Sequence, residues 1–133
     1  MSNSKLLRIF NILLPFFYAG LILYVSTLPD VDPPSFNIDN IDKLYHGLEY
    51  FVFSVVILRA LPKVHESRRR WWLYLLLILA GSAFAAMDEF LQSFVPNRDS
   101  TPGDWVADTI GFAVAAISVA LIRTRFGRNF LTN

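Results

Sequence analysis

The sequence predicts an all-α membrane protein: one domain over residues 1–133, built as a bundle of four transmembrane helices. Three observations support this. Apolar residues make up 54% of the chain and charged residues 17%, against roughly 45–50% and 25% in typical soluble proteins. The apolar residues fall into four blocks, each close to the ~20 residues that a helix needs to cross about 30 Å of hydrocarbon. Prolines separate these blocks.

The four blocks define the expected helices, at about residues 6–26, 44–61, 71–91 and 105–122. A chain of this length has too little interior to bury four such segments as a soluble domain. Proline lacks a backbone N–H and disfavours helix in the residue before it. Each break between blocks contains proline, at Pro29, Pro33, Pro34, Pro62, Pro96 and Pro102.

The basic residues predict the orientation. With four spans, ten of the 12 Lys and Arg residues lie on one side of the membrane: Lys5, Arg8, Arg59, Lys63, Arg68, Arg69, Arg70, Arg123, Arg125 and Arg128. The positive-inside rule places that side, with both termini, in the cytoplasm. Of the 11 acidic residues, all but Glu66 lie near the opposite, outer face.

The cluster Arg68–Arg70 does not indicate nucleic-acid binding. It directly precedes Trp71 and Trp72 at the expected membrane surface. Basic residues and tryptophans at that depth are typical of a topology determinant with an aromatic anchor. We therefore expect membrane lipids, and no nucleic acid, as partners of this part of the chain.

The outer ends of the second, third and fourth helices carry ionisable residues. Asp42, His46 and Glu49 follow an i, i+4, i+7 spacing, which places them on one stripe of the second helix. The third helix ends with Asp88, Glu89 and Gln92, and the fourth has Asp104 and Asp108 one turn apart. Lipid cannot satisfy such groups, so we expect them to face the interior of the bundle.

A purely structural interpretation exists for several of these residues. Asp104 follows Pro102 and Gly103 and has the appearance of a helix N-cap. Lys43 and Arg98 would pair with nearby carboxylates, and His46 would form an interhelical hydrogen bond. However, the outer end holds more acids than two cations require. Ionisable residues inside a span are by default a hypothesis for a functional site.

Small residues recur at every fourth position of the fourth helix, at Ala107, Gly111 and Ala115. Such a stripe favours close approach of two helices. We expect it to serve packing within the chain; formation of a homodimer is the alternative use.

Three motifs resemble those of the VanZ-like family of small bacterial membrane proteins. The first is Asp-Lys-x-x-His-x-x-x-Tyr, which ends at Tyr50; the second is Asp-Glu-x-x-Gln followed by Arg98. The third is Asp-x-x-x-Asn-x-x-Gly, ending at Gly111, in which Asp108 replaces the usual Asn. A second departure is Asn97, where a Gly often precedes the Arg. The resemblance runs from about residue 27 to residue 120.

The resemblance implies a multi-pass protein of the bacterial cytoplasmic membrane with a role in the cell envelope. The family is named for a member linked to resistance to the glycopeptide teicoplanin, and the resemblance implies no particular reaction. The expected ligand is an envelope lipid, a lipid-linked glycan or a lipoglycopeptide. The predicted ligand-binding residues are Asp42, Lys43, His46, Glu49, Tyr50, Asp88, Glu89, Gln92, Arg98, Asp104 and Asp108.

Enzymatic activity is left open by the sequence. In an enzyme of the outer leaflet, His46, Glu49, Asp88 and Glu89 would be the catalytic candidates, acting as general acids and bases. The same groups could hold a divalent cation that polarises a phosphate, although no metal-ligand set is defined. Transport is disfavoured because the cytoplasmic half of the spans offers no ionisable residue away from the interface. No nucleophilic serine motif or phosphate-binding glycine-rich loop is present.

Overall fold

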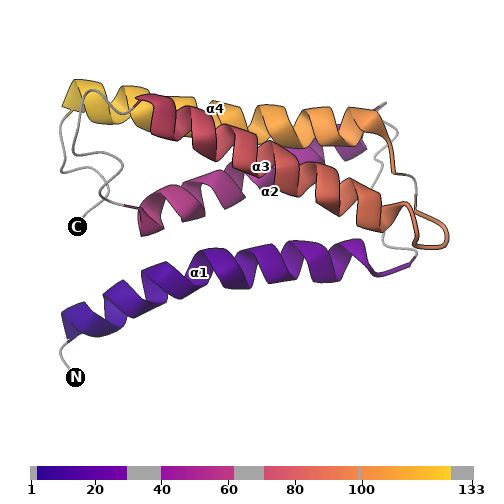
Figure 1. Cartoon of the computed structure of the whole chain (residues 1–133), viewed down its shortest axis with the longest axis horizontal. Helices are drawn as coiled ribbons and strands as arrows, with labels where there is room; N and C mark the ends of the chain where they lie inside the picture. The colour runs from indigo at the N-terminus through magenta and orange to yellow at the C-terminus, as the bar shows by residue number, and fades with distance from the viewer. Residues whose placement is uncertain (1–2, 30–39, 62–70, 99, 127–133) are drawn as a thin grey trace.

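The computed structural model describes residues 3–29, 40–61, 71–98 and 100–126, which form an all-helical bundle (Figure 1). Within these residues there are four helices: α1 (Asn3–Ser26), α2 (Ile41–Ala60), α3 (Trp71–Gln92) and α4 (Pro102–Phe126). The all-α prediction is therefore confirmed. Pro62, the cluster Arg68–Arg70, Arg128 and the acidic residues between Asp30 and Asp39 lie outside the described residues.

Three of the helices are long and apolar enough to cross a membrane: Asn3–Ser26, Trp71–Gln92 and Pro102–Arg123. Side chains such as Phe16, Phe17 and Leu79 are exposed on the outside of the bundle, as expected where lipid is the solvent. Helix α2 differs in composition, because its 20 residues include four charged ones: Asp42, Lys43, Glu49 and Arg59.

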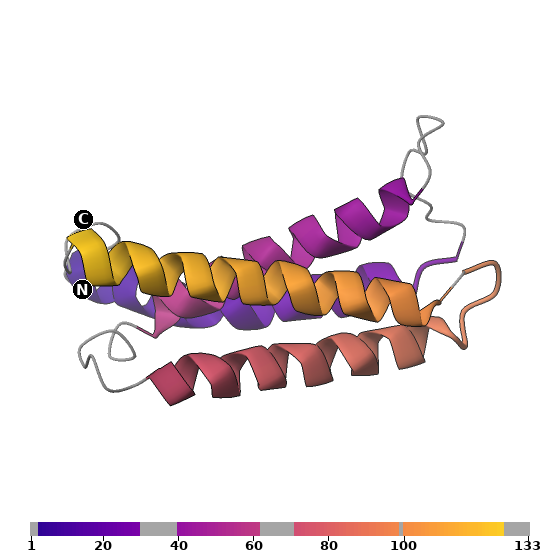
Figure 2. The ribbon, with the colours of Figure 1, turned by 90° about the horizontal axis from the view of Figure 1, so that it is seen from above.

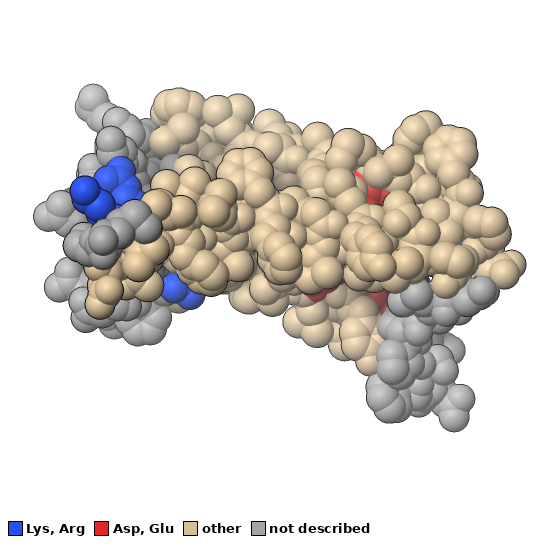
Figure 3. All heavy atoms as spheres, turned by 90° about the horizontal axis from the view of Figure 1, so that it is seen from below, with Lys and Arg blue, Asp and Glu red and all other residues tan. Residues whose placement is uncertain are grey.

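Successive helices run in opposite directions, so the eight helix ends gather at two ends of the bundle (Figures 1 and 2). We call the end formed by Ser26, Ile41, Gln92 and Pro102 the polar end. The opposite end holds both termini of the described chain. On the face drawn in Figure 3, basic atoms are visible at that opposite end and acidic atoms only in the other half of the molecule. Two described basic residues, Lys43 and Arg98, belong to the polar end.

Aromatic rings fill the centre of the bundle. Phe53 of α2 lies 5.3 Å from Phe84 and 6.1 Å from Phe112 between ring centroids, and Tyr18 of α1 stacks on it at 5.8 Å. Phe112 is buried at 1% exposure. All four helices thus meet in one aromatic core. The polar end begins where this core ends.

Helices α2 and α4 make the most extensive contact of the bundle. Their backbones touch at two glycines: a Cβ atom added at Gly111 would collide with the carbonyl group of Gly47. One turn further, Ala115 is fully buried. The expectation that the small-residue stripe serves packing within the chain is confirmed at these positions.

The start of α4 corrects one expectation. Asp104 is the third residue of the helix and not its N-cap, because the helix begins at Pro102. Its carboxylate accepts hydrogen bonds from the backbone N–H of Thr101 at 3.2 Å and from the Thr101 hydroxyl at 2.7 Å. Proline is favoured at the first helical position, where its missing N–H costs nothing. The helix therefore starts three residues earlier than the apolar block suggested.

Candidate functional site

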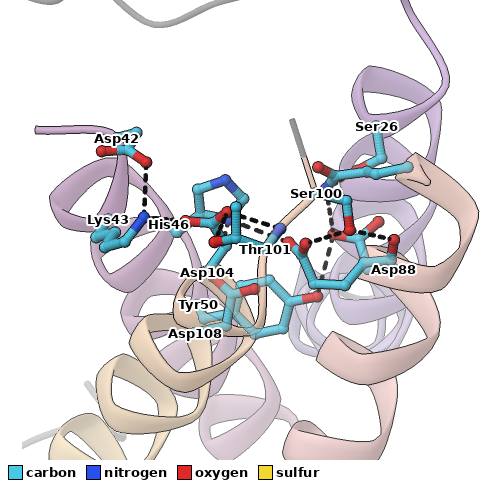
Figure 4. Close-up of polar contacts among 12 residues, drawn as sticks. Ser26, Asp42, Lys43, His46, Tyr50, Asp88, Ser100, Thr101, Asp104 and Asp108 are labelled. Carbon is cyan, nitrogen blue, oxygen red and sulfur yellow. Dashed lines mark hydrogen bonds and ion pairs between the residues drawn. The ribbon is translucent and has the colours of Figure 1, made fainter. Parts of the chain in front are cut away.

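Buried polar side chains from all four helices meet at the polar end (Figure 4). Six of them expose 7% or less of their surface: Ser26, Asp88, Glu89, Gln92, Asp104 and Asp108. Burial of a charge is expensive unless the group is paired or binds a cation. How each carboxylate is satisfied therefore decides what this end of the protein can bind.

The first group joins α2, α3 and α4. His46 places Nδ1 3.2 Å from Oδ1 of Asp108 and 3.8 Å from Oε1 of Glu89. The first distance is that of a hydrogen bond. Gly47, next to His46, and Gly111, one turn after Asp108, let the two helices approach closely enough for this contact. The fold brings these three residues together although Glu89 follows His46 by 43 positions and Asp108 follows Glu89 by another 19.

The second group is centred on Asp88, which is 1% exposed. Its Oδ2 accepts a hydrogen bond from the hydroxyl of Tyr50 at 3.3 Å and another from the amide of Gln92 at 3.3 Å. The same amide donates to the hydroxyl of Ser26 at 3.2 Å. Helix α1 is thereby attached to the polar end through a buried hydrogen bond.

The third group is an ion-pair cluster at the rim. Lys43 donates to Asp42 and to Asp104, both at 2.9 Å. Its hydrogen bond to Asp42, followed by that to Asp104, raises the pKa of Lys43 above its ordinary value. The hydrogen bond from Lys43 lowers the pKa of Asp42. Both groups therefore remain charged at neutral pH, and Lys43 acts as a link between α2 and α4.

The segment between α3 and α4 closes over Glu89. The hydroxyl of Ser100 donates to the backbone carbonyl of Glu89 at 2.8 Å and to its Oε2 at 2.9 Å. This leaves the other oxygen of the carboxylate, Oε1, directed towards His46. Arg98, in the same segment, is half-buried.

Glu49 follows His46 by three residues on the same helix. It is half-buried on α2, and the charges of His46, Asp88, Asp108 and Arg98 all act on its carboxyl group. Arg98 is thus close enough to the cluster for its positive charge to be felt there. The polar end therefore contains a guanidinium that can bind an anion and carboxylates that can bind a cation.

Three buried carboxylate oxygens have no hydrogen-bond partner among the described residues. They are Oδ1 of Asp88, Oε1 of Glu89 and Oδ2 of Asp108. Buried polar groups in folded proteins are nearly always hydrogen-bonded, and each exception requires an explanation. These three oxygens lie at the polar end, two on α3 and one on α4. The described residues contain one further buried polar atom without a partner, Oγ of Ser54 on α2.

Sequence reasoning found most of these residues but not their grouping. It placed Asp42, His46 and Glu49 on one stripe; in the structure Asp42 belongs to the rim with Lys43, whereas His46 reaches Asp108. It missed residues with hydroxyl side chains: Ser26, Ser100 and Thr101. A signal for Ser26 was available, because it is a lone polar residue at the end of an apolar block.

The chemistry available at this site is of two kinds. The pair of His46 and Asp108 can hold or move a proton, since a carboxylate orients the imidazole ring. His46, Glu89 and Asp108 also offer one ligand atom each, all within 4.8 Å of one another, which is a donor set for a metal ion.

Comparison with known proteins assigns the family. The VanZ/LLP1 family matches residues 2–123. The chain therefore belongs to the VanZ/LLP1 family, which confirms the resemblance, and with three helices of spanning length and composition it is a membrane protein. Neither the curated proteins nor the solved structures contain a significant match to the chain.

Proposed function

We propose that the chain is a single domain that crosses the bacterial cytoplasmic membrane four times, with α2 as the fourth span and both termini in the cytoplasm. Helix α2 has 20 residues, the length of a span, and it packs against α4 and α1. Its Lys43 is paired with Asp104 of α4, which supports its place in the bundle. The segregation of basic residues at the end opposite the polar end supports the orientation. The polar end then opens to the outer face.

The topology can be tested by labelling single cysteines, since the natural chain has none. Cysteines at Ser35 and Ser67 fall in the first and second breaks of the sequence. An impermeant thiol reagent added to intact cells should label position 35 and not position 67; after lysis it should label both. Labelling of position 67 alone in intact cells would reverse the orientation.

We further propose that the polar end binds an envelope ligand, namely an envelope lipid, a lipid-linked glycan or a lipoglycopeptide. The observation that carries this proposal is the group of buried carboxylates whose oxygens lack partners within the described chain. A bundle that needed only structural polar contacts would satisfy these atoms internally. Family membership supports a link to resistance against glycopeptides of the teicoplanin type.

The binding site proposed here consists of the residues predicted from the sequence, with Lys43 and Asp104 in a supporting role. These two residues hold each other at the rim. His46, Glu49 and Arg98 are half-buried, so they are reachable from outside. Asp88, Glu89 and Asp108 lie deeper and set the charge of the site. Formation of a homodimer remains the alternative use of the small residues on α4. No contact among the described residues requires it.

Ligand binding can be measured with the purified protein in nanodiscs and fluorescent probes: a lipid-linked disaccharide, an anionic phospholipid and teicoplanin. At least one probe should bind saturably. Glu49→Gln should weaken that binding by about tenfold, since a hydrogen bond to a charged group is worth about 1.5–3 kcal/mol. Arg59→Gln, at the opposite end of α2, is the matched control and should bind normally. Absence of saturable binding for all three probes would overturn the proposal.

A second candidate function is an outer-leaflet enzyme acting on a lipid-linked or phosphorylated substrate. The observation that favours it is the contact of 3.2 Å between His46 and Asp108, with the Glu89 carboxylate beside them. In this arrangement His46 would act as the general acid or base. The same nanodisc samples decide between the two functions: product formation from a bound probe indicates an enzyme, and binding without product indicates a binder.

A further inference from the structure

Three potential metal ligands from three different helices converge at the polar end. Nδ1 of His46 lies 3.2 Å from Oδ1 of Asp108 and 3.8 Å from Oε1 of Glu89. Around a tetrahedral ion with bonds of about 2.1 Å, neighbouring ligand atoms stand about 3.4 Å apart. The two distances from His46 lie on either side of that value, and all three ligand atoms lie within 4.8 Å of one another. The two carboxylates would move towards each other to bind an ion.

A second observation, independent of the clustering, indicates that these carboxylates lack a partner. Oε1 of Glu89 and Oδ2 of Asp108 are buried and accept no hydrogen bond from the described residues. Asp108 is 0% exposed and Glu89 is 7% exposed. Oε1 of Glu89 points to His46, while Ser100 holds the other oxygen of the same carboxylate. The side chain is therefore oriented with one oxygen left available.

The balance of charge leads to the same site. Asp88, Glu89 and Asp108 are buried close together, with a single imidazole between the last two. Lys43 is already bound to Asp104 and Asp42, and the charge of Arg98 acts on a further carboxyl group, that of Glu49. Several buried carboxylates cost much free energy unless a positive charge compensates them. A divalent cation supplies that charge without adding a bulky side chain.

We propose that His46, Glu89 and Asp108 bind one divalent transition-metal ion of the Zn²⁺ or Mn²⁺ type. Zn²⁺ accepts histidine nitrogen together with carboxylate oxygen, and carboxylate-rich sites also suit Mn²⁺. On binding, the ion takes the place of the proton shared between His46 and Asp108. Ca²⁺ and Mg²⁺ prefer all-oxygen sites and should bind much more weakly.

Three protein ligands leave at least one coordination position free. His46 is 19% exposed, so this position is reachable from the outer side. The inference deepens and rests on the proposed function, because the ion would be the group to which an anionic headgroup of the envelope ligand coordinates. The positive charge of the ion also explains how a site with several buried carboxylates can attract an anion. The charge of Arg98, felt at Glu49, supports the same ligand from the loop.

Metal binding can be measured on the full chain, purified in detergent, stripped with a chelator and titrated with Zn²⁺ or with Co²⁺ as its coloured substitute. One ion should bind per chain, and Co²⁺ should give visible absorption bands. Glu89→Gln and Asp108→Asn should weaken binding by about a hundredfold or more, because loss of outer-sphere partners alone costs about 10–100-fold. The control is Arg59→Gln, on the last turn of α2 at the end opposite the proposed metal site. It should bind nearly as the natural chain does.

A spectroscopic readout keeps the test valid if one variant folds poorly. Mn²⁺ bound to the natural chain should show a nitrogen coupling in pulsed electron paramagnetic resonance, and His46→Gln should abolish that coupling. Circular dichroism and gel filtration report whether each variant retains its fold. The proposal is overturned if the folded natural chain binds no Zn²⁺, Co²⁺ or Mn²⁺, or if folded Asp108→Asn binds the metal as tightly as the Arg59→Gln control.

The two proposals can fail separately. If the stripped chain takes up no metal but still binds an envelope probe, the metal site is refuted and the ligand-binding function stands. If Zn²⁺ binds with the expected dependence on His46, Glu89 and Asp108 but no envelope probe binds, the metal site stands and the ligand-binding function is refuted.

Discussion

Replacing Gly111 with alanine should destabilise the whole bundle by about 2 kcal/mol and lower its melting temperature by about 5–10 °C. Alanine is favoured over glycine within a helix by up to about 1 kcal/mol, but overpacking costs about 1–3 kcal/mol and sometimes more. Here the cost dominates, because the new Cβ would meet the backbone of Gly47, with its carbonyl carbon only 2.7 Å away. A backbone atom cannot turn aside as a side chain can.

The measurement is thermal unfolding in detergent, followed by circular dichroism or gel filtration. Gly20→Ala in α1 is the matched control, since a Cβ there has nothing within 4 Å; it should melt at or slightly above the natural temperature. The Gly111 variant should also lose Zn²⁺ or probe binding, because separation of α2 from α4 pulls His46 away from Asp108. Equal melting temperatures for the two glycine variants would show that the α2–α4 contact can accept a methyl group at position 111.

The second large effect is expected from Arg98→Lys, which should weaken ligand binding by about tenfold or more while the protein remains folded. A guanidinium binds a phosphate or carboxylate through two parallel hydrogen bonds, a geometry that lysine cannot reproduce. Arg98 is half-buried in the segment between α3 and α4, where its charge acts on Glu49. A contact used only for structure is worth roughly 0–1 kcal/mol at an exposed position and would tolerate lysine.

The readout is teicoplanin susceptibility of cells that express each variant, together with probe binding in nanodiscs. Arg98→Lys should reduce binding by about tenfold or more while membrane levels and melting temperature stay normal. Arg59→Lys, on the last turn of α2 at the opposite end, is the control and should be silent. Full function of Arg98→Lys would leave Arg98 with a structural role alone.

The helices could be located from the sequence because lipid imposes a long apolar run on each span. The predicted blocks at 71–91 and the observed α3 differ by a single residue. The predicted starts of α2 and α4, at residues 44 and 105, lie three residues after the observed starts at Ile41 and Pro102. The apolar blocks did not include the polar first turn of each helix. In α4 that turn is stabilised by the Asp104 carboxylate, which accepts hydrogen bonds from the backbone N–H and the hydroxyl of Thr101, a contact that composition does not show.

The membership of the site was also predictable, but its internal pairing was not. Spacing along a helix shows which residues share a face; it does not show how far two helices are rotated towards each other. Asp88 and Glu89 are adjacent and diverge by about 100° around the helix axis. As a result Asp88 turns to Tyr50 and Glu89 turns to His46. The position of His46 opposite Asp108 depends on the close packing of α2 and α4 at Gly47 and Gly111, which the spacing of residues along one helix does not show.

The charged composition of α2 has a consequence for how the protein is made. In the proposed four-span arrangement this helix leaves the ribosome second, when its partners for Lys43 and His46, which belong to α4, have not been synthesised. Among the charged residues of α2 only Glu49 lies well inside the helix, and a carboxylate at that depth opposes insertion of the helix on its own. Helix α2 therefore becomes stable across the bilayer only after α3 and α4 have been inserted. In this arrangement the last helix to be synthesised is needed to hold the second one in the membrane.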